Sequence, residues 1–85
     1  MAMDARDMTL ALLAERGTEK TICPSEVARA LTKAGGAADA WRGTMPAVHD
    51  AVDRLNTEGL VQLSWKGKML RARSGPYRIA RGIAR

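Results

Sequence analysis

The side chains best suited to chemistry in this sequence are cations, and they gather in its last twenty residues. Residues 1–65 hold seven basic and nine acidic side chains, whereas residues 66–85 hold seven basic side chains and no acid. Cations without neighbouring carboxylates favour contacts with nucleic-acid phosphates, and Trp65 and Tyr77 lie among them. The simpler interpretation is that these side chains only solvate a loop.

Two other groups have the residue types of catalytic sites. His49 stands beside Asp50 and Asp53, but general-base chemistry also needs a nucleophile or metal and a concave pocket, so we interpret it as a surface histidine. Cys23 precedes Pro24 at an expected helix start, where a thiolate can be stabilised, although a small cap residue is the preferred interpretation. With one cysteine and one histidine, we expect no metal site, no cofactor and no enzymatic activity.

Length and composition predict one domain. The 85 residues are 46% hydrophobic and 27% charged, which is typical of a folded soluble chain. We expect a single unit over residues 1–85, with a core over about 4–80 and a basic tail over 81–85. No apolar run approaches the roughly 18 residues that span a bilayer, and the lone cysteine fits a reducing compartment, so we expect a cytoplasmic protein without a membrane contact.

Local signals place the first two helices. A helix is predicted from Asp4 to Arg16, with Gly17 ending it. An extended step at Thr21–Cys23 then leads into a second helix that begins at Pro24, a residue suited to the first helical position. Glu26 occupies the third position of a capping box, and the cysteine before the proline is the expected cap residue.

A turn over residues 34–40 leads to a third helix, which we expect to begin after a cap at Thr44. Its apolar stripe is spaced by three and four residues and consists of Met45, Val48, Val52 and Leu55. Gly59 ends this helix, with Leu55 and Leu60 in the contact of a Schellman end. Strands are predicted at Leu60–Trp65 and about Tyr77–Ala80, joined by a turn at Lys66 and Gly67.

This order of elements predicts an α+β winged helix: a three-helix bundle with a C-terminal two-stranded β-hairpin wing. The sequence also resembles a family of small uncharacterised bacterial winged-helix proteins classed as a domain of unknown function. The resemblance is carried by four blocks, which are TICPSEVARAL from Thr21, WR with Met45 and Val48, GLVQLSWKGK from Gly59, and GPYRIARG from Gly75. The family implies the fold and brings no activity or ligand.

Members of that family tend to carry basic residues on the third helix, directly after the position of Val48. This chain has His49, Asp50 and Asp53 on that face instead, and carboxylates there oppose a polyanion, so base reading by the third helix is disfavoured.

We therefore predict a small DNA-binding or transcription-associated module of weak sequence specificity, which contacts double-stranded DNA at its phosphates through the wing. The candidate phosphate contacts are Arg42, Arg54, Lys66, Lys68, Arg71, Arg73 and Arg78. Arg42 has a second interpretation, as the partner of an acid such as Glu26 or Asp39. The alternative function is a protein-interaction or dimerisation module, in which an acidic third-helix face and a basic wing bind a partner or a second copy.

Overall fold

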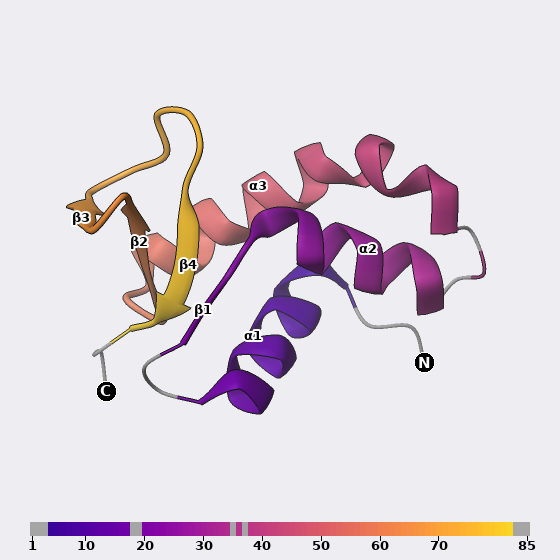
Figure 1. Cartoon of the computed structure of the whole chain (residues 1–85), viewed down its shortest axis with the longest axis horizontal. Coiled ribbons are helices and arrows are strands. Elements are labelled where there is room, and N and C mark those ends of the chain that lie inside the picture. The colour runs from indigo at the N-terminus through magenta and orange to yellow at the C-terminus, as the bar shows by residue number, and fades with distance from the viewer. Residues whose placement is uncertain (1–3, 18–19, 35, 37, 83–85) are drawn as a thin grey trace.

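Three α-helices and a four-stranded antiparallel sheet form a mixed α+β structure over the described residues (Figure 1). It is a computed structural model, and it describes residues 4–17, 20–34, 36 and 38–82. The elements in chain order are α1 (Ala5–Arg16), β1 (Thr21–Ile22), α2 (Pro24–Ala34), the 3-10 turn η1 (Ala38–Ala40), α3 (Trp41–Thr57), β2 (Val61–Trp65), β3 (Lys68–Leu70) and β4 (Arg78–Arg81). The sheet lies beside the C-terminal end of α3, whereas the end of α2 and the start of α3 lie at the opposite end of the molecule (Figure 1).

Helix α2 begins at Pro24 as predicted, and α1 begins at Ala5, one residue after the predicted start. The Asp4 carboxylate caps α1 by accepting a 2.8 Å bond from the Asp7 amide, and Gly17 ends the helix with a positive φ of 92°. At the start of α2 the Cys23 amide donates to the Glu26 carboxylate at 2.7 Å, which confirms the reach-back half of the capping box.

Helix α3 begins at Trp41, so the prediction that it starts after Thr44 is wrong. The Thr44 hydroxyl instead donates to the Ala40 carbonyl at 3.4 Å, as a residue within a helix does. Trp41 stands four residues before Met45 and so lengthens the apolar stripe by one turn, and it packs against the core. Of the turn predicted over 34–40, residues 38–40 form η1, and residues 35 and 37 lie outside the described part.

The C-terminal end of α3 is the predicted Schellman motif. The Leu60 amide donates to the Leu55 carbonyl at 2.9 Å, and the Gly59 amide donates to the Asn56 carbonyl at 3.1 Å. Gly59 has a φ of 78°, a conformation that side-chain-bearing residues rarely adopt. This end sets the direction in which the chain enters β2.

The sheet differs from the predicted two-stranded terminal hairpin. Its strand order is β1-β4-β2-β3, so the extended step before α2 is a strand that pairs with β4. The turn at Lys66 and Gly67 leads from β2 directly into β3, and the chain returns in β4 only after residues 71–77. Of the predicted basic tail, Arg81 ends β4, and residues 83–85 lie outside the described part.

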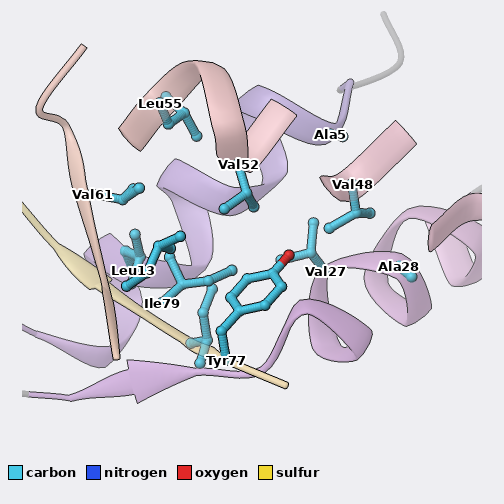
Figure 2. Close-up of a cluster of buried hydrophobic side chains, with 12 residues drawn as sticks. Ala5, Leu13, Val27, Ala28, Val48, Val52, Leu55, Val61, Tyr77 and Ile79 are labelled. Atoms are coloured by element: carbon cyan, nitrogen blue, oxygen red, sulfur yellow. The ribbon is translucent and has the colours of Figure 1, made fainter. Parts of the chain in front are cut away.

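The core joins the helices to one face of the sheet. Its buried side chains are Ala5, Leu13, Ile22, Val27, Ala28, Val48, Val52, Leu55, Val61, Leu63, Tyr77 and Ile79. Figure 2 shows the Tyr77 ring among the aliphatic members of this cluster. No helix in the described ranges has both the length and the apolarity to cross a bilayer.

Gly82 supplies a test of this packing. A Cβ at residue 82 would overlap the Gly59 carbonyl oxygen and lie 2.8 Å from the Leu60 carbonyl carbon, which are backbone atoms that cannot rotate away. Gly82→Ala should therefore lower the free energy of unfolding by about 1–3 kcal/mol. Gly43→Ala is the matched control, because a Cβ there meets nothing within 4 Å and the helix should gain about 0.5–1 kcal/mol. Urea denaturation measures both, and equal stability of the two variants would contradict the packing of residue 82.

Candidate nucleic-acid interface

The predicted cations lie mostly on the segment between β2 and β4, residues 66–77, which we call the β2–β4 connection. It begins with a two-residue turn in which Lys66 and Gly67 have positive φ values of 51° and 82°. Such turns match the twist of a hairpin, and this one places Lys68 opposite Trp65 in the β2–β3 ladder. The ladder therefore holds Lys66 and Lys68 at the exposed tip of the hairpin.

An ion pair and a hydrogen bond tie the connection back to α3. Both Asp53 carboxylate oxygens accept bonds of 2.8 Å from the Arg73 guanidinium, a bidentate arrangement. Three residues further along the helix, the Asn56 side-chain amide donates to the Arg71 carbonyl at 2.7 Å. Residues separated by three or four positions share a helix face, so Asp53 and Asn56 hold the connection along one side of α3.

A third contact extends this side of α3 towards its start. The Tyr77 hydroxyl and His49 Nδ1 lie 2.6 Å apart, and Tyr77 is only 4% exposed. Burial raises the pKa of Tyr77, so its hydroxyl keeps its proton, and burial together with the Arg73 charge lowers the pKa of His49. When the imidazole is neutral and carries its proton on Nε2, Nδ1 accepts the hydrogen bond from this hydroxyl. We call His49, Asp53 and Asn56 the polar stripe of α3.

These contacts divide the predicted candidates into two groups. Arg73 has its charge compensated, because its hydrogen bonds lower the pKa of Asp53 and keep that carboxylate ionised. Arg78 is half-buried and donates to Thr21 Oγ1 at 2.6 Å, to Cys23 Sγ at 3.0 Å and to the Thr21 carbonyl at 3.3 Å. Arg73 and Arg78 therefore hold the fold together, the first across the connection and the second between β4 and β1.

Three candidates on the connection are exposed and unpaired. Lys66, Lys68 and Arg71 make no ion pair with any carboxylate in the described part of the chain. Trp65 beside them is 38% exposed, and the Lys66 ammonium lies 6.0 Å from the centre of its ring. Lys66, Lys68 and Arg71 therefore form an exposed positive surface. The segment that carries them is held in place by the β2–β3 hairpin and by the polar stripe of α3.

The two candidates on α3 lie apart from this group. Arg54 lines a hollow of about 380 Å³ between α1 and α3, whose walls also carry Asp50 and Glu58. Arg42 is exposed in the first turn of α3, with its guanidinium carbon 4.6 Å from the centre of the Trp41 ring. No ion pair joins Arg42 to Glu26 or Asp39, and Glu26 instead pairs with Arg16 at 2.6 Å.

The positioning role of Asn56 was not foreseen in the sequence. Its signal is the spacing of His49, Asp53 and Asn56, which places polar side chains next to the apolar stripe at intervals of four and three. Such a stripe predicts a second packing surface on the helix, although it does not identify the segment that covers it.

A double-mutant cycle tests the ion pair. Both side chains are partly exposed, 34% for Arg73 and 45% for Asp53, so solvent screens the attraction. The cycle of Asp53→Ala and Arg73→Ala should give a coupling free energy of about 0.5–1 kcal/mol from urea denaturation. Asp50→Ala in place of Asp53→Ala is the control, and an equal coupling for both pairs would show that the Asp53 contact is absent.

The stability of the chain should depend on pH through His49. Because its folded pKa lies below 6.5, the unfolded chain takes up the proton first as the pH falls, and the folded state loses stability below that value. His49 is the only histidine. Of its neighbours, Asp53 has a lowered pKa because Arg73 hydrogen-bonds its carboxylate, and Arg73 and Tyr77 have raised pKa values, so these three titrate outside the range from pH 5.5 to 7. Urea midpoints should fall across this range in the natural chain and stay nearly level in His49→Gln. Parallel curves would refute this.

Comparison with known proteins places the sequence in a family. The model of a family described as "Protein of unknown function (DUF3253)" matches residues 3–82. No curated protein matches the chain. The match confirms the resemblance to a domain family of unknown function.

Proposed function

The chain belongs to the DUF3253 family, whose description names no activity, and from its geometry we propose that it is a non-catalytic winged-helix module that binds double-stranded DNA through phosphates. The observation that carries this proposal is the set of three exposed, unpaired cations on the β2–β4 connection: Lys66, Lys68 and Arg71. Positive charge that no internal carboxylate compensates is what a polyanion recognises.

The topology supports the winged-helix part of the proposal. The order is helix, strand, two helices and then strands, and the strand after α1 pairs with the last strand, which closes the sheet over the helices. In this interpretation the β2–β4 connection is the wing, enlarged by the short strand β3. Winged helices commonly lay their third helix on DNA and place the wing on phosphates.

The internal ion pairs also support the proposal, because they compensate negative charge at α3 that would repel DNA phosphates. Asp53 is neutralised by Arg73, and Glu58 accepts bonds of 2.9 and 2.7 Å from Arg6. Of the acids on α3, Asp50 makes no ion pair within the part of the chain that the structure describes. The repulsion between α3 and a phosphate backbone is therefore smaller than the residue count implies.

The same ion pairs weaken the alternative, a module that binds a protein partner or a second copy through an acidic third-helix face. Such a face needs carboxylates without internal partners, and Asp53 and Glu58 each have one. A second copy of the chain therefore offers the basic wing no strongly acidic third-helix face to bind.

Phosphate contacts from lysine and arginine side chains fix a protein on DNA and carry little information about bases. The turn and the ladder define the backbone path over residues 66–68, whereas long lysine side chains have many rotamers with which to reach phosphates. We therefore propose weak sequence specificity, with similar affinities for unrelated duplexes.

Salt dependence of binding tests the proposal. Each phosphate contact contributes about 0.9 to the slope of log affinity against log salt, so Lys66→Gln/Lys68→Gln should lower that slope by about 2. Lys20→Gln/Arg81→Gln is the control, since it removes the same charge from exposed cations outside the connection. Fluorescence anisotropy with two unrelated duplexes gives the slopes.

Equal slopes for the two double variants would contradict binding through the connection. Absence of duplex binding at 50 mM salt would contradict the proposed function altogether. Size-exclusion chromatography of the same samples tests the alternative, which predicts association that the Lys66→Gln/Lys68→Gln variant loses.

A further inference from the structure

A second group of cations lies outside the β2–β4 connection, where α2 packs against the start of α3. The guanidinium carbons of Arg29 and Arg42 each lie 4.6 Å from the centre of the Trp41 ring. Arg29 comes from α2, whereas Trp41 and Arg42 open α3, so the fold brings together residues from two helices. We call these three residues the arginine–tryptophan cluster.

The cluster holds two like charges close together without compensation. Since both guanidinium carbons lie 4.6 Å from one ring centre, they are at most about 9 Å apart. Neither makes an ion pair or a hydrogen bond through its guanidinium within the described ranges, although Asp39 is close in sequence. Arg6, Arg16 and Arg73 by contrast each have a carboxylate partner.

The indole fixes the positions of both charges. Trp41 is half-buried, and its packing against the hydrophobic core holds the ring in position. Arg29 and Arg42 are exposed. A guanidinium over an aromatic face is held by cation–π attraction, and its five N–H donors stay available to an acceptor. Two exposed guanidinium groups without an internal acceptor in the described ranges match the oxygens of a phosphate, which arginine binds in a bidentate manner.

Resting on the proposed DNA-binding function, we propose that Arg29, Trp41 and Arg42 form a second phosphate-contact site, which holds the DNA backbone at the start of α3. Arg29 and Arg42 are exposed, and other residues line the hollow between α1 and α3. Exposed cations outside that hollow suit an extended polyanion better than a small phosphorylated ligand.

The position of the cluster complements that of the connection. Fourteen residues separate Arg42 from Asn56, whose amide holds Arg71, and at about 1.5 Å per helical residue this is roughly 21 Å along α3. The major groove is about 12 Å wide, so two contacts at this spacing can reach backbone on both of its sides. The cluster and the connection therefore hold the two ends of α3 against DNA.

The test compares Arg29→Gln/Arg42→Gln with Lys66→Gln/Lys68→Gln and with the control Lys20→Gln/Arg81→Gln. Loss of the cluster should lower the salt slope for a duplex by about 2, so that the fall in affinity between 50 and 200 mM salt becomes about tenfold smaller. The variant that carries all four substitutions should have a slope of log affinity against log salt that is lower by about 4. Arg29→Lys/Arg42→Lys keeps the charge and should keep the slope. Its affinity for the duplex should fall, because a lysine ammonium lacks the planar guanidinium that binds phosphate in a bidentate manner.

A Trp65→Phe background leaves Trp41 as the only tryptophan, whose emission then reports the cluster directly. The emission should change on adding duplex and should not change in Arg29→Gln/Arg42→Gln, with circular dichroism melts confirming that this variant folds. An unchanged slope for the cluster variant beside a reduced slope for the connection variant would overturn the second site and leave the proposed function standing. An emission change with inorganic phosphate but no binding of duplex would overturn both DNA as the occupant and the proposed function.

Discussion

The bidentate contact between Asp53 and Arg73 decides how the cationic segment is presented. Residues 71–77 form no regular secondary structure, so contacts with α3 must hold their path. The paired carboxylate and guanidinium supply one, and the neighbouring Asn56 and His49 add hydrogen bonds on either side. Because Tyr77 carries this path into the buried cluster, the polar stripe and the hydrophobic core support each other.

The same contacts redistribute charge over the surface. Two carboxylates form ion pairs with arginines from distant segments of the chain, Asp53 with Arg73 and Glu58 with Arg6. Among the cations that no carboxylate compensates in the described residues, two groups contain several charges close together: the hairpin tip and the arginine–tryptophan cluster. They form two positive surfaces at opposite ends of α3 in a chain whose net charge is +5, which is the physical basis for proposing a phosphate backbone as the partner.

Features set by neighbouring residues were predictable from the sequence, and features set by distant residues were not. The end of α1 at Gly17, the reach-back contact of Glu26 and the glycine end at Gly59 depend on contacts within a few residues, and the structure confirms them. The start of α3 was misplaced because Thr44 resembles a cap, whereas packing of Trp41 on the core extends the helix. The Asp53–Arg73 pair joins residues twenty apart, and β3 is only three residues long, so neither leaves a local pattern.

An amide NMR titration of the whole chain with a duplex of arbitrary sequence tests most directly whether the two cationic surfaces contact DNA. Shift changes should concentrate at residues 66–71 and at the start of α3 around Arg42, with little change along the exposed side of α1. Shift changes centred instead on Asp50 and the hollow between α1 and α3, or no changes at all, would contradict this contact.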